Sequence, residues 1–287
     1  MPERIQTVAI FGVGLIGGSF ALALRKAGFS GTILGVSSPA TLRRALDLSV
    51  IDRATSTEEA ARSADLLYLA QPIRRILTLL PELNRSVRPD ALITDAGSTK
   101  STIMARAADE LTRCKFLGGH PMAGKEQRGT EAATADLFRG RKYVLTPRFQ
   151  SDIDLPIVRE FLSWIVKIGA IPVVLGAEEH DRTVAYTSHL PQLASTALAA
   201  VLDGRDSELP VSGPALLDMT RLALSPFDVW GDILATNGPA IRVALDRYIQ
   251  KLKVFSEVLD AESMAKEFER ASAVARQLRR MRGESDI

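Results

Sequence analysis

The sequence predicts an α/β domain, in which helices cover both faces of a mainly parallel sheet, followed by an all-helical domain. Two observations lead to this prediction. Short apolar runs alternate with amphipathic helical patterns in the first part of the chain, which is typical of parallel strands joined by crossover helices. From about Ala177 onwards no apolar run resembles a strand, and apolar residues follow helical spacing. The expected domains are residues 1–176 and 177–287.

The expected strands are short and rich in branched aliphatic residues: Thr7–Phe11, Thr32–Val36, Leu66–Ala70, Ala91–Thr94, Tyr143–Thr146, Pro172–Leu175 and, more weakly, Lys115–Leu117. The expected helices between them are Leu15–Ala27, Pro39–Leu48, Thr57–Arg62, Ile73–Leu80, Thr99–Thr112 and Leu155–Ile168. In the tail they are Glu178–Leu202, Pro214–Leu224, Pro226–Ala235 and Pro239–Met281. Because an apolar helix stripe needs a partner, we expect a homodimer formed through these C-terminal helices.

The composition is that of a globular protein. The 287 residues are 46% hydrophobic and 24% charged, and the net charge of +2 gives no field that favours nucleic acid or a membrane surface. The stretch Ile5–Leu24 is uncharged and long enough for a membrane span, but its four glycines argue against that interpretation. A single cysteine, Cys114, excludes an internal disulfide, and a cytoplasmic location is expected.

A glycine-rich turn follows the first expected strand. Gly12, Gly14 and Gly17 match the G-x-G-x-x-G pattern between a strand and a helix, which is the context of a dinucleotide site in a Rossmann-type doubly wound sheet. The first glycine permits the tight turn, the second lets the pyrophosphate approach, and the third lets helix and strand pack closely. Further cofactor contacts are expected from Leu15, Ile16, Ala70 and Pro72.

The end of the second strand bears on the choice of cofactor. An NAD site usually has an acidic residue about 20 residues beyond the glycines, which binds the ribose hydroxyls. Here the strand is followed by Ser37 and Ser38, and the first acid is Asp47. Ser37, Ser38 and Thr41 can bind a 2′-phosphate, and Arg43 or Arg44 can neutralise it, so NADP is favoured over NAD. Alternatively, these arginines are only a solvated helix face.

The chain has three histidines, and two of them lie in informative surroundings. His120 is preceded by two glycines and followed by Pro121, which restricts the backbone of His120 to extended conformations. We expect His120 to lie on a rigid loop after a strand, where it is well placed as a general base. His189 precedes Pro191 within a helical run, so a helix kink is expected there. His180 and Asp181 are expected to be structural or hinge residues, and no histidine spacing suggests a metal site.

Five segments together resemble the prephenate and arogenate dehydrogenase family: Gly12–Ser19, Asp95–Lys100, Gly118–Glu126, Ser188–Pro191 and Met219–Trp230. The block Gly-Gly-His-Pro-Met-Ala-Gly combined with Ser-His-Leu-Pro is the most specific part. The resemblance implies a nicotinamide-dependent oxidation of a cyclohexadienyl acid, with loss of its ring carboxylate as carbon dioxide. Tyrosine or its immediate precursor would be the product.

The resemblance also implies roles for individual residues. His120 would accept the hydroxyl proton, and Ser98 would hydrogen-bond near the same hydroxyl. Arg221 would pair with the ring carboxylate, for which its planar fork is suited. His189 would contact the substrate side chain, and Glu126 would gate the pocket. Gln192, three residues after His189, is expected from its spacing to share the same helix face and is a further candidate substrate residue.

Each role has an alternative. Ser98 would otherwise be a helix cap, Glu126 a surface acid, and Arg221 a structural partner of Asp218 or Asp228. Two other functions stay open: a different two-domain dehydrogenase of the hydroxyacid or pyrroline-reductase kind, and a non-catalytic NADP sensor. Prephenate and arogenate are not distinguished, because Gln192 is neutral.

Overall fold

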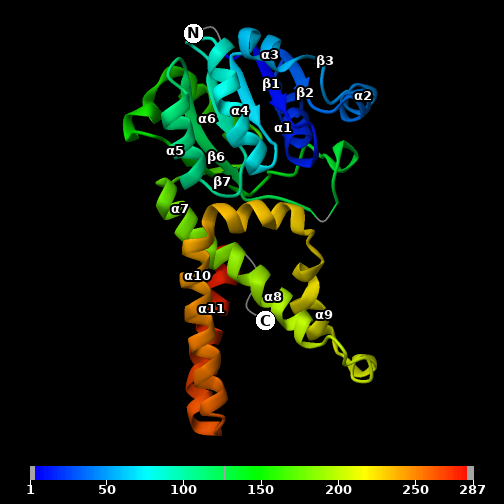
Figure 1. Ribbon diagram of the computed structural model, residues 1–287, viewed down its shortest axis with the longest axis vertical. Coiled ribbons are helices and arrows are strands. Elements are labelled where there is room, and N and C mark those ends of the chain that lie inside the picture. The colour runs from blue at the N-terminus through cyan, green and yellow to red at the C-terminus, as the bar shows by residue number, and fades with distance from the viewer. Residues whose placement is uncertain (1–3, 126, 283–287) are drawn as a thin grey trace. The chain divides into compact units, whose positions relative to one another are not determined.

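The computed structural model describes residues 4–125 and 127–282, and the chain divides into two compact units, residues 1–238 and 239–287 (Figure 1). The first unit contains one eight-stranded sheet in the order β3-β2-β1-β4-β5-β6-β7-β8. Its strands are β1 (Thr7–Phe11), β2 (Thr32–Val36), β3 (Arg53–Ala54), β4 (Leu66–Leu69), β5 (Leu92–Asp95), β6 (Lys115–Pro121), β7 (Lys142–Thr146) and β8 (Ile171–Val174).

The sheet is doubly wound, as predicted. All neighbouring strands are parallel except β6 and β7, which are antiparallel. The strand order reverses beside β1, because β2 pairs with one edge of β1 and β4 with the other. In such sheets ligands bind beyond the carboxyl ends of the strands at the point of reversal.

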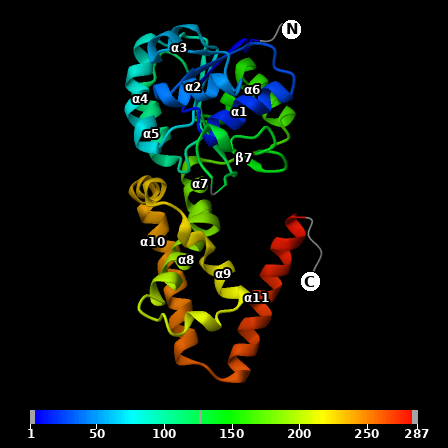
Figure 2. The same ribbon diagram turned by 90° about the vertical axis from the view of Figure 1, so that its right-hand side faces the viewer.

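Helices cover both faces of the sheet, with α4 and α5 on one side and α1 and α6 on the other (Figure 2). Apolar side chains fill the space beneath them. On the second side, Phe20 of α1 stacks on Tyr68 of β4 with ring centroids 4.0 Å apart, and Phe161 of α6 meets Tyr143 of β7 edge-on. The helices of this region are α1 (Leu15–Lys26), α2 (Pro39–Asp47), α3 (Thr57–Ser63), α4 (Ile73–Ser86), α5 (Ser101–Glu110) and α6 (Pro156–Lys167).

Three features of the sheet region differ from the prediction. Strand β3 was not predicted, because two residues are too short to show a hydrophobic period. Helix α4 continues through Pro81 to Ser86, since Leu79, Leu80 and Leu83 extend its buried stripe. Strand β6 continues to Pro121 where only Lys115–Leu117 was expected, because its second half pairs with β7.

After β8, the described residues form no further strand, as predicted. The helices are α7 (Ala177–Val184), α8 (Leu190–Val201), α9 (Pro214–Thr220), α10 (Phe227–Glu257) and α11 (Ala261–Arg282). A π-helical turn, Ala185–His189, joins α7 to α8, and Pro191 stands at the start of α8. The predicted distortion at His189 is therefore real and takes the form of a π turn, which commonly marks a functional site.

The boundaries of the last two helices were predicted wrongly. The expected break before Pro239 is only a kink at Asn237, whose φ of −129° and ψ of 19° are not helical. Proline disrupts the preceding turn without ending the helix here. The expected continuous helix Pro239–Met281 is instead interrupted after Glu257, and α11 begins at Ala261.

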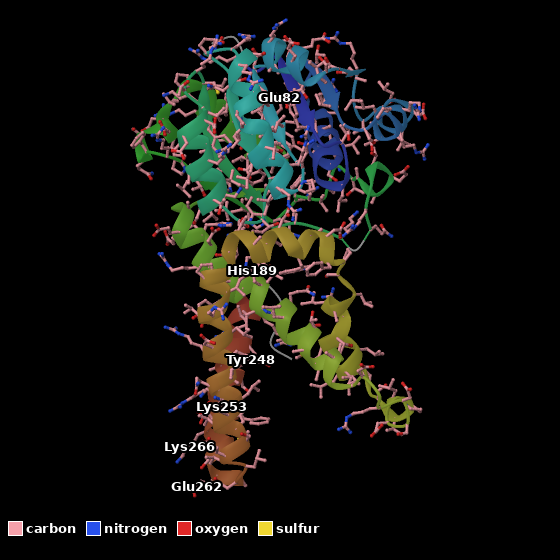
Figure 3. All side chains as sticks on the ribbon, viewed as in Figure 1. Glu82, His189, Tyr248, Lys253, Glu262 and Lys266 are labelled. Carbon is pink, nitrogen blue, oxygen red and sulfur yellow. The ribbon has the colours of Figure 1, made fainter. Side chains whose placement is uncertain are left out.

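The second unit, residues 239–287, contains the end of α10 together with α11. Lys251 and Glu267 form an ion pair of 3.1 Å between the two helices. Lys266 pairs with Glu262 within α11, and both residues are labelled in Figure 3. Several large apolar side chains of this unit are exposed, among them Leu259, Phe268, Leu278 and Met281. No helix among the described residues is long and apolar enough to cross a membrane.

Candidate active site

The glycine turn has the geometry of a dinucleotide site. Gly12 adopts a φ of +89°, and a Cβ there would lie 2.5 Å from the carbonyl oxygen of Ala70. A Cβ on Gly17 would lie 2.1 Å from the carbonyl oxygen of Gly12, so α1 packs directly on the turn. A Cβ on Gly14 would meet nothing within 4 Å. The space beside Gly14 at the start of α1 is thus open for a phosphate, and the turn fits the pyrophosphate of a dinucleotide.

The residues after β2 are those predicted to bear on the choice between NAD and NADP. Ser38 caps α2, because its hydroxyl accepts a hydrogen bond from the backbone N–H of Thr41 at 3.3 Å, and the two hydroxyls lie 2.9 Å apart. Ser37 is half-buried and Arg43 is exposed. Arg44 pairs with Glu131 at 3.0 Å. Of the two arginines predicted to neutralise a 2′-phosphate, Arg44 thus already has an acidic partner.

One pocket brings together cofactor residues and Ser98. Ile16, Ala70, Pro72 and Ser98 all line it, while Leu15 packs half-buried against the core. The side-chain oxygen of Gln71, which also lines the pocket, is buried without a hydrogen-bond partner among the described residues. This pocket lies where the sheet reverses, and its mixture of apolar walls and few polar groups suits a small planar ring.

A buried ion pair ties the loop of Ser98 to the strand of His120. The ammonium of Lys100 is fully buried and contacts the carboxylate of Asp95, and it also donates to the carbonyl oxygen of Gly119 at 2.6 Å. Asp95 in turn accepts from the backbone N–H of Gly119 at 3.0 Å. Burial lowers the pKa of Lys100, which Asp95 partly counteracts. Only glycine fits at position 119, since a Cβ there would lie 2.4 Å from the carbonyl oxygen of Asp95.

His120 is held on β6 itself, not on a loop after the strand as predicted. Its partner in the antiparallel ladder is Val144 of β7, and its side chain is 9% exposed. Its Nδ1 lies 2.8 Å from Nε2 of His180, whose Nδ1 lies 2.8 Å from a carboxylate oxygen of Asp181. Burial, together with the neighbouring His180, Lys100 and His189, holds the pKa of His120 well below its usual range. The ring is therefore neutral at pH 7 and able to accept a proton.

Asn237 connects this chain of hydrogen bonds to His189. Its side-chain amide donates to the backbone carbonyl of Asp181 at 2.8 Å and lies 3.2 Å from Nδ1 of His189. Burial lowers the pKa of His189 to about 4. The ring of Trp230 packs edge-on against His189, with centroids 5.8 Å apart. The π turn and the kink at Asn237 thus serve to bring His189 beside the same network.

A second pocket contains Arg221. Its lining includes Trp230 and three cationic residues, Lys125, Arg128 and Arg221. Asp228 is paired with Arg128 through two hydrogen bonds of 2.8 and 3.0 Å. Such a pocket favours an anionic ligand.

Two predicted substrate residues need separate comment. The side-chain amide of Gln192 donates to the carbonyl oxygen of Leu222 at 2.7 Å and to Thr196 at 3.2 Å, so it holds the turn that carries Arg221. Glu126 lies outside the described residues.

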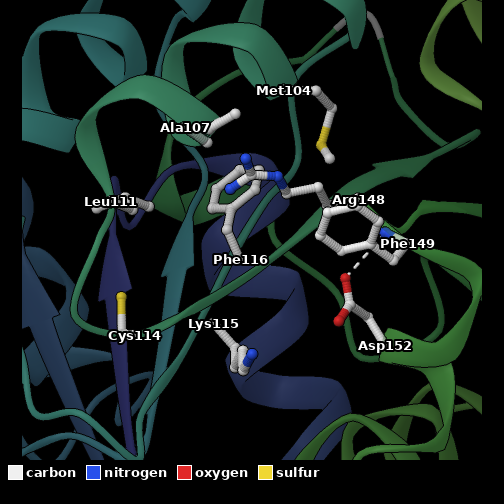
Figure 4. Close-up of a pocket in the computed structure, with 10 residues that line it drawn as sticks. Met104, Ala107, Leu111, Cys114, Lys115, Phe116, Arg148, Phe149 and Asp152 are labelled. Atoms are coloured by element: carbon white, nitrogen blue, oxygen red, sulfur yellow. Dashed lines mark hydrogen bonds between the residues drawn. The ribbon is translucent and has the colours of Figure 1, made fainter.

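A further hollow lies away from these residues, between α5 and the loop after β7 (Figure 4). Met104, Phe116 and Phe149 give it apolar walls. The carboxylate of Asp152 accepts from the backbone N–H of Phe149 at 3.0 Å, and burial raises the pKa of Cys114 to about 11. None of the predicted site residues lines this hollow.

Sequence reasoning missed the groups that hold the site together. His180, Asp181 and Asn237 were not expected near His120, because nothing local in the sequence indicates contacts between residues 60 or more positions apart. Thr130 was also missed; its hydroxyl donates to the carbonyl oxygen of Val13 within the glycine turn. Nothing in the sequence indicated that the charged side chain of Lys100 is fully buried. Its position between a strand and the start of a helix indicated only a site beside a cofactor or an anion.

A glycine turn and a neutral, buried histidine at the carboxyl edge of a doubly wound sheet define a dinucleotide-dependent oxidoreductase. The family descriptions "Prephenate dehydrogenase, nucleotide-binding domain" and "Prephenate dehydrogenase, dimerization domain" match residues 20–169 and 176–271. The chain belongs to the prephenate dehydrogenase family, which includes arogenate dehydrogenases.

Individual relatives agree with this assignment. The chain is 33% identical to prephenate dehydrogenase of Bacillus subtilis over 94% of this chain and 76% of the relative. The structure of A. aeolicus prephenate dehydrogenase in complex with hydroxyphenyl propionate and NAD+ matches with a TM-score of 0.87 and 30% identity, over 98% of this chain and 99% of that one. Arogenate dehydrogenase of Synechocystis matches with a TM-score of 0.80 and 26% identity, over 96% and 99%.

Proposed function

We propose that this enzyme oxidises prephenate and releases its ring carboxylate as carbon dioxide, which yields 4-hydroxyphenylpyruvate. The observation that supports this most strongly is the position of His120, a buried histidine whose strand is tied to the Ser98 loop by Lys100, which contacts both Asp95 and the carbonyl oxygen of Gly119. When bound, the nicotinamide accepts the hydride from the hydroxyl-bearing carbon of the substrate. Loss of the carboxylate makes the ring aromatic and drives the reaction forward.

His120 and Ser98 are proposed to act on the hydroxyl group. His120 takes the hydroxyl proton as hydride leaves the same carbon, and a neutral imidazole suits this role. Ser98 lines the pocket that also contains Ile16 and Ala70, which puts it beside the proposed cofactor site. The ion pair of Lys100 and Asp95 holds the loop of Ser98 against the strand that carries His120.

The cationic pocket is proposed to bind the two carboxylates of prephenate. Arg221 pairs with the ring carboxylate, for which a bidentate guanidinium is suited. Lys125 and Arg128 stabilise the carboxylate of the pyruvyl side chain. His189, which packs against Trp230 of the same pocket, contacts that side chain. The pocket has no acidic group among its described lining residues to bind the amino group of arogenate. Prephenate is therefore the preferred substrate.

NADP is the proposed cofactor, with NAD as the alternative. Gly12, Gly14 and Gly17 hold the pyrophosphate, and no acid follows β2 to exclude a 2′-phosphate. Ser37, Ser38 and Thr41 offer hydroxyls, and Arg43 offers the charge. NAD is favoured by the NAD+ complex of the A. aeolicus relative.

A homodimer formed through the C-terminal helices is also proposed, with the cofactor in residues 1–176 and substrate binding and dimerisation in residues 177–287. The exposed apolar residues of α10 and α11 support this arrangement, because unpaired stripes of this kind associate in water. The apolar stripe predicted for α10 passes from buried at Ile241 to exposed at Leu252. Light scattering would test it, and a monomer with full activity would contradict it.

The substrate and cofactor are tested by a four-way assay. Prephenate or arogenate is supplied with NAD or NADP, and the reduced nicotinamide is followed by absorbance. We expect the largest kcat/KM with prephenate and NADP. Faster turnover of arogenate would show that Lys125 and Arg128 do not select the side chain. If folded protein that binds NADP produces no reduced nicotinamide in any of the four combinations, the proposed function is contradicted.

A further inference from the structure

The hydrogen bonds that connect His120 to His180 and Asp181 form a continuous network, and the reaction proposed above assigns no role to it. It runs from Nδ1 of His120 to Nε2 of His180, and from Nδ1 of His180 to Asp181, with both contacts at 2.8 Å. All three side chains are buried, at 9%, 0% and 3% exposure. This hydrogen-bond network contacts the imidazole of His120 at Nδ1, and Nε2 lies on the opposite side of the ring.

The directions of these hydrogen bonds follow from Asp181. Its carboxylate accepts backbone N–H groups from Lys100 at 2.7 Å and Ser101 at 2.8 Å, at the start of α5. Burial alone would raise the pKa of Asp181, but the hydrogen bonds from His180, Ser101 and Lys100 outweigh it and hold the pKa below its usual range. An ionised carboxylate only accepts hydrogen bonds, so His180 must donate from Nδ1.

This leaves the proton of His120 in a defined place. A neutral imidazole with its proton on Nδ1 has a bare Nε2, so Nε2 of His180 accepts. The donor to it is Nδ1 of His120, whose own Nε2 is then bare.

We propose that His180 and Asp181 are positioning residues that fix His120 in the tautomer with a bare Nε2 facing the substrate. The proposal rests on the proposed role of His120 as proton acceptor. The hydroxyl proton passes to Nε2 of His120, which becomes an imidazolium, while the hydride and the carboxylate leave as described above. The imidazolium still donates from Nδ1 to His180, and the negative charge of Asp181 stabilises it through that ring. The logic is that of a serine-protease triad, in which a third group sets the tautomer of the base.

The tautomer can be measured directly. The chain has only three histidines, so 15N-histidine labelling gives a simple long-range 1H–15N spectrum, and the variants His120→Gln and His189→Asn assign it. The 15N shifts report which ring nitrogen carries a proton. We expect protonated Nδ1 and bare Nε2 in both His120 and His180 of the full-length wild-type enzyme. A proton on Nε2 of His120, or a doubly protonated His180, would overturn the proposal without any variant.

Two variants at position 180 separate positioning from simple stability. His180→Gln keeps an oxygen that can accept from His120, whereas His180→Leu keeps bulk but no acceptor. We expect His180→Leu to lower kcat about 10- to 100-fold with KM and NADP affinity little changed, and His180→Gln to recover part of the loss. Equal kcat in both variants and in wild type would refute the role of His180. If His120→Gln itself retains full turnover, the proposed function of His120 fails instead, so the two failures are distinguishable.

Discussion

The second and third glycines of the cofactor turn, Gly14 and Gly17, are expected to respond differently to the same added methyl group. In Gly17→Ala the new Cβ would lie 2.1 Å from the carbonyl oxygen of Gly12 and 2.7 Å from Cγ2 of Ile10. The first of these is a backbone atom that cannot rotate away. We therefore expect a loss near the upper end of overpacking costs, about 3 kcal/mol, which corresponds to a fall in Tm of roughly 5–10 °C.

In Gly14→Ala the methyl group meets no protein atom within 4 Å, and the φ of Gly14 is −90°, which alanine adopts readily. The fold should lose less than about 1 kcal/mol, mostly from the weaker helix cap. The methyl group does occupy the space proposed for the pyrophosphate. Loss of one charged hydrogen bond costs about 1.5–3 kcal/mol, so the cofactor Kd should rise about 10- to 100-fold.

Thermal melting without cofactor and calorimetric titration with NADP and NAD would measure the two effects separately. Gly17→Ala should melt early, and Gly14→Ala should melt normally but bind weakly. Normal cofactor binding by Gly14→Ala would refute the placement of the pyrophosphate. An unchanged Tm for Gly17→Ala would refute the close packing of α1 on the turn.

Three other predictions concern the pockets and the buried network. Arg221→Ala should raise the KM for prephenate about 10- to 100-fold with a smaller effect on kcat, since a charged contact is lost; steady-state kinetics showing no change would return Arg221 to a structural role. Lys100→Met leaves Asp95 buried without its cation and should lower the free energy of unfolding, measured in urea, by about 3–5 kcal/mol. The control Arg106→Ala removes an exposed ion pair and should lower it by less than about 1 kcal/mol. Equal losses in the two variants would contradict the buried pair. Burial lowers the pKa of His189 to about 4, against about 6.5 in the unfolded chain, so above pH 6.5 both states are neutral and His189 adds no pH dependence. As pH falls from 6.5 to 4, the unfolded state alone binds the proton, and the free energy of unfolding should drop by about 3 kcal/mol. Denaturation of His189→Asn should show a shallower acid loss, and an unaltered slope would contradict the burial of a neutral ring.

The sequence was most informative where structure is local. Strand β1 and helix α1 follow from an apolar run, three glycines and a helical period, all within residues 7–26. The kink at His189 follows from Pro191, two residues away. In each case the residues that cause the feature lie in the same short segment as the feature itself.

Features that depend on distant partners could not be predicted in this way. His120 lies on a strand because β7 pairs with β6, and no periodicity in a run containing two glycines reveals that pairing. Likewise, the contact between His120 and His180 joins the sheet to α7. A buried Lys100 contradicts the usual exposure of lysine, and only its partner Asp95 explains it.

The most direct test of the account is the kcat of His120→Gln with prephenate and NADP, measured beside wild type together with cofactor Kd and Tm. Glutamine keeps the polar bulk of the side chain but cannot act as a base. The account predicts that kcat falls at least about 100-fold, with cofactor Kd little changed and the protein still folded. Turnover close to that of wild type would contradict the claim that His120 accepts the hydroxyl proton.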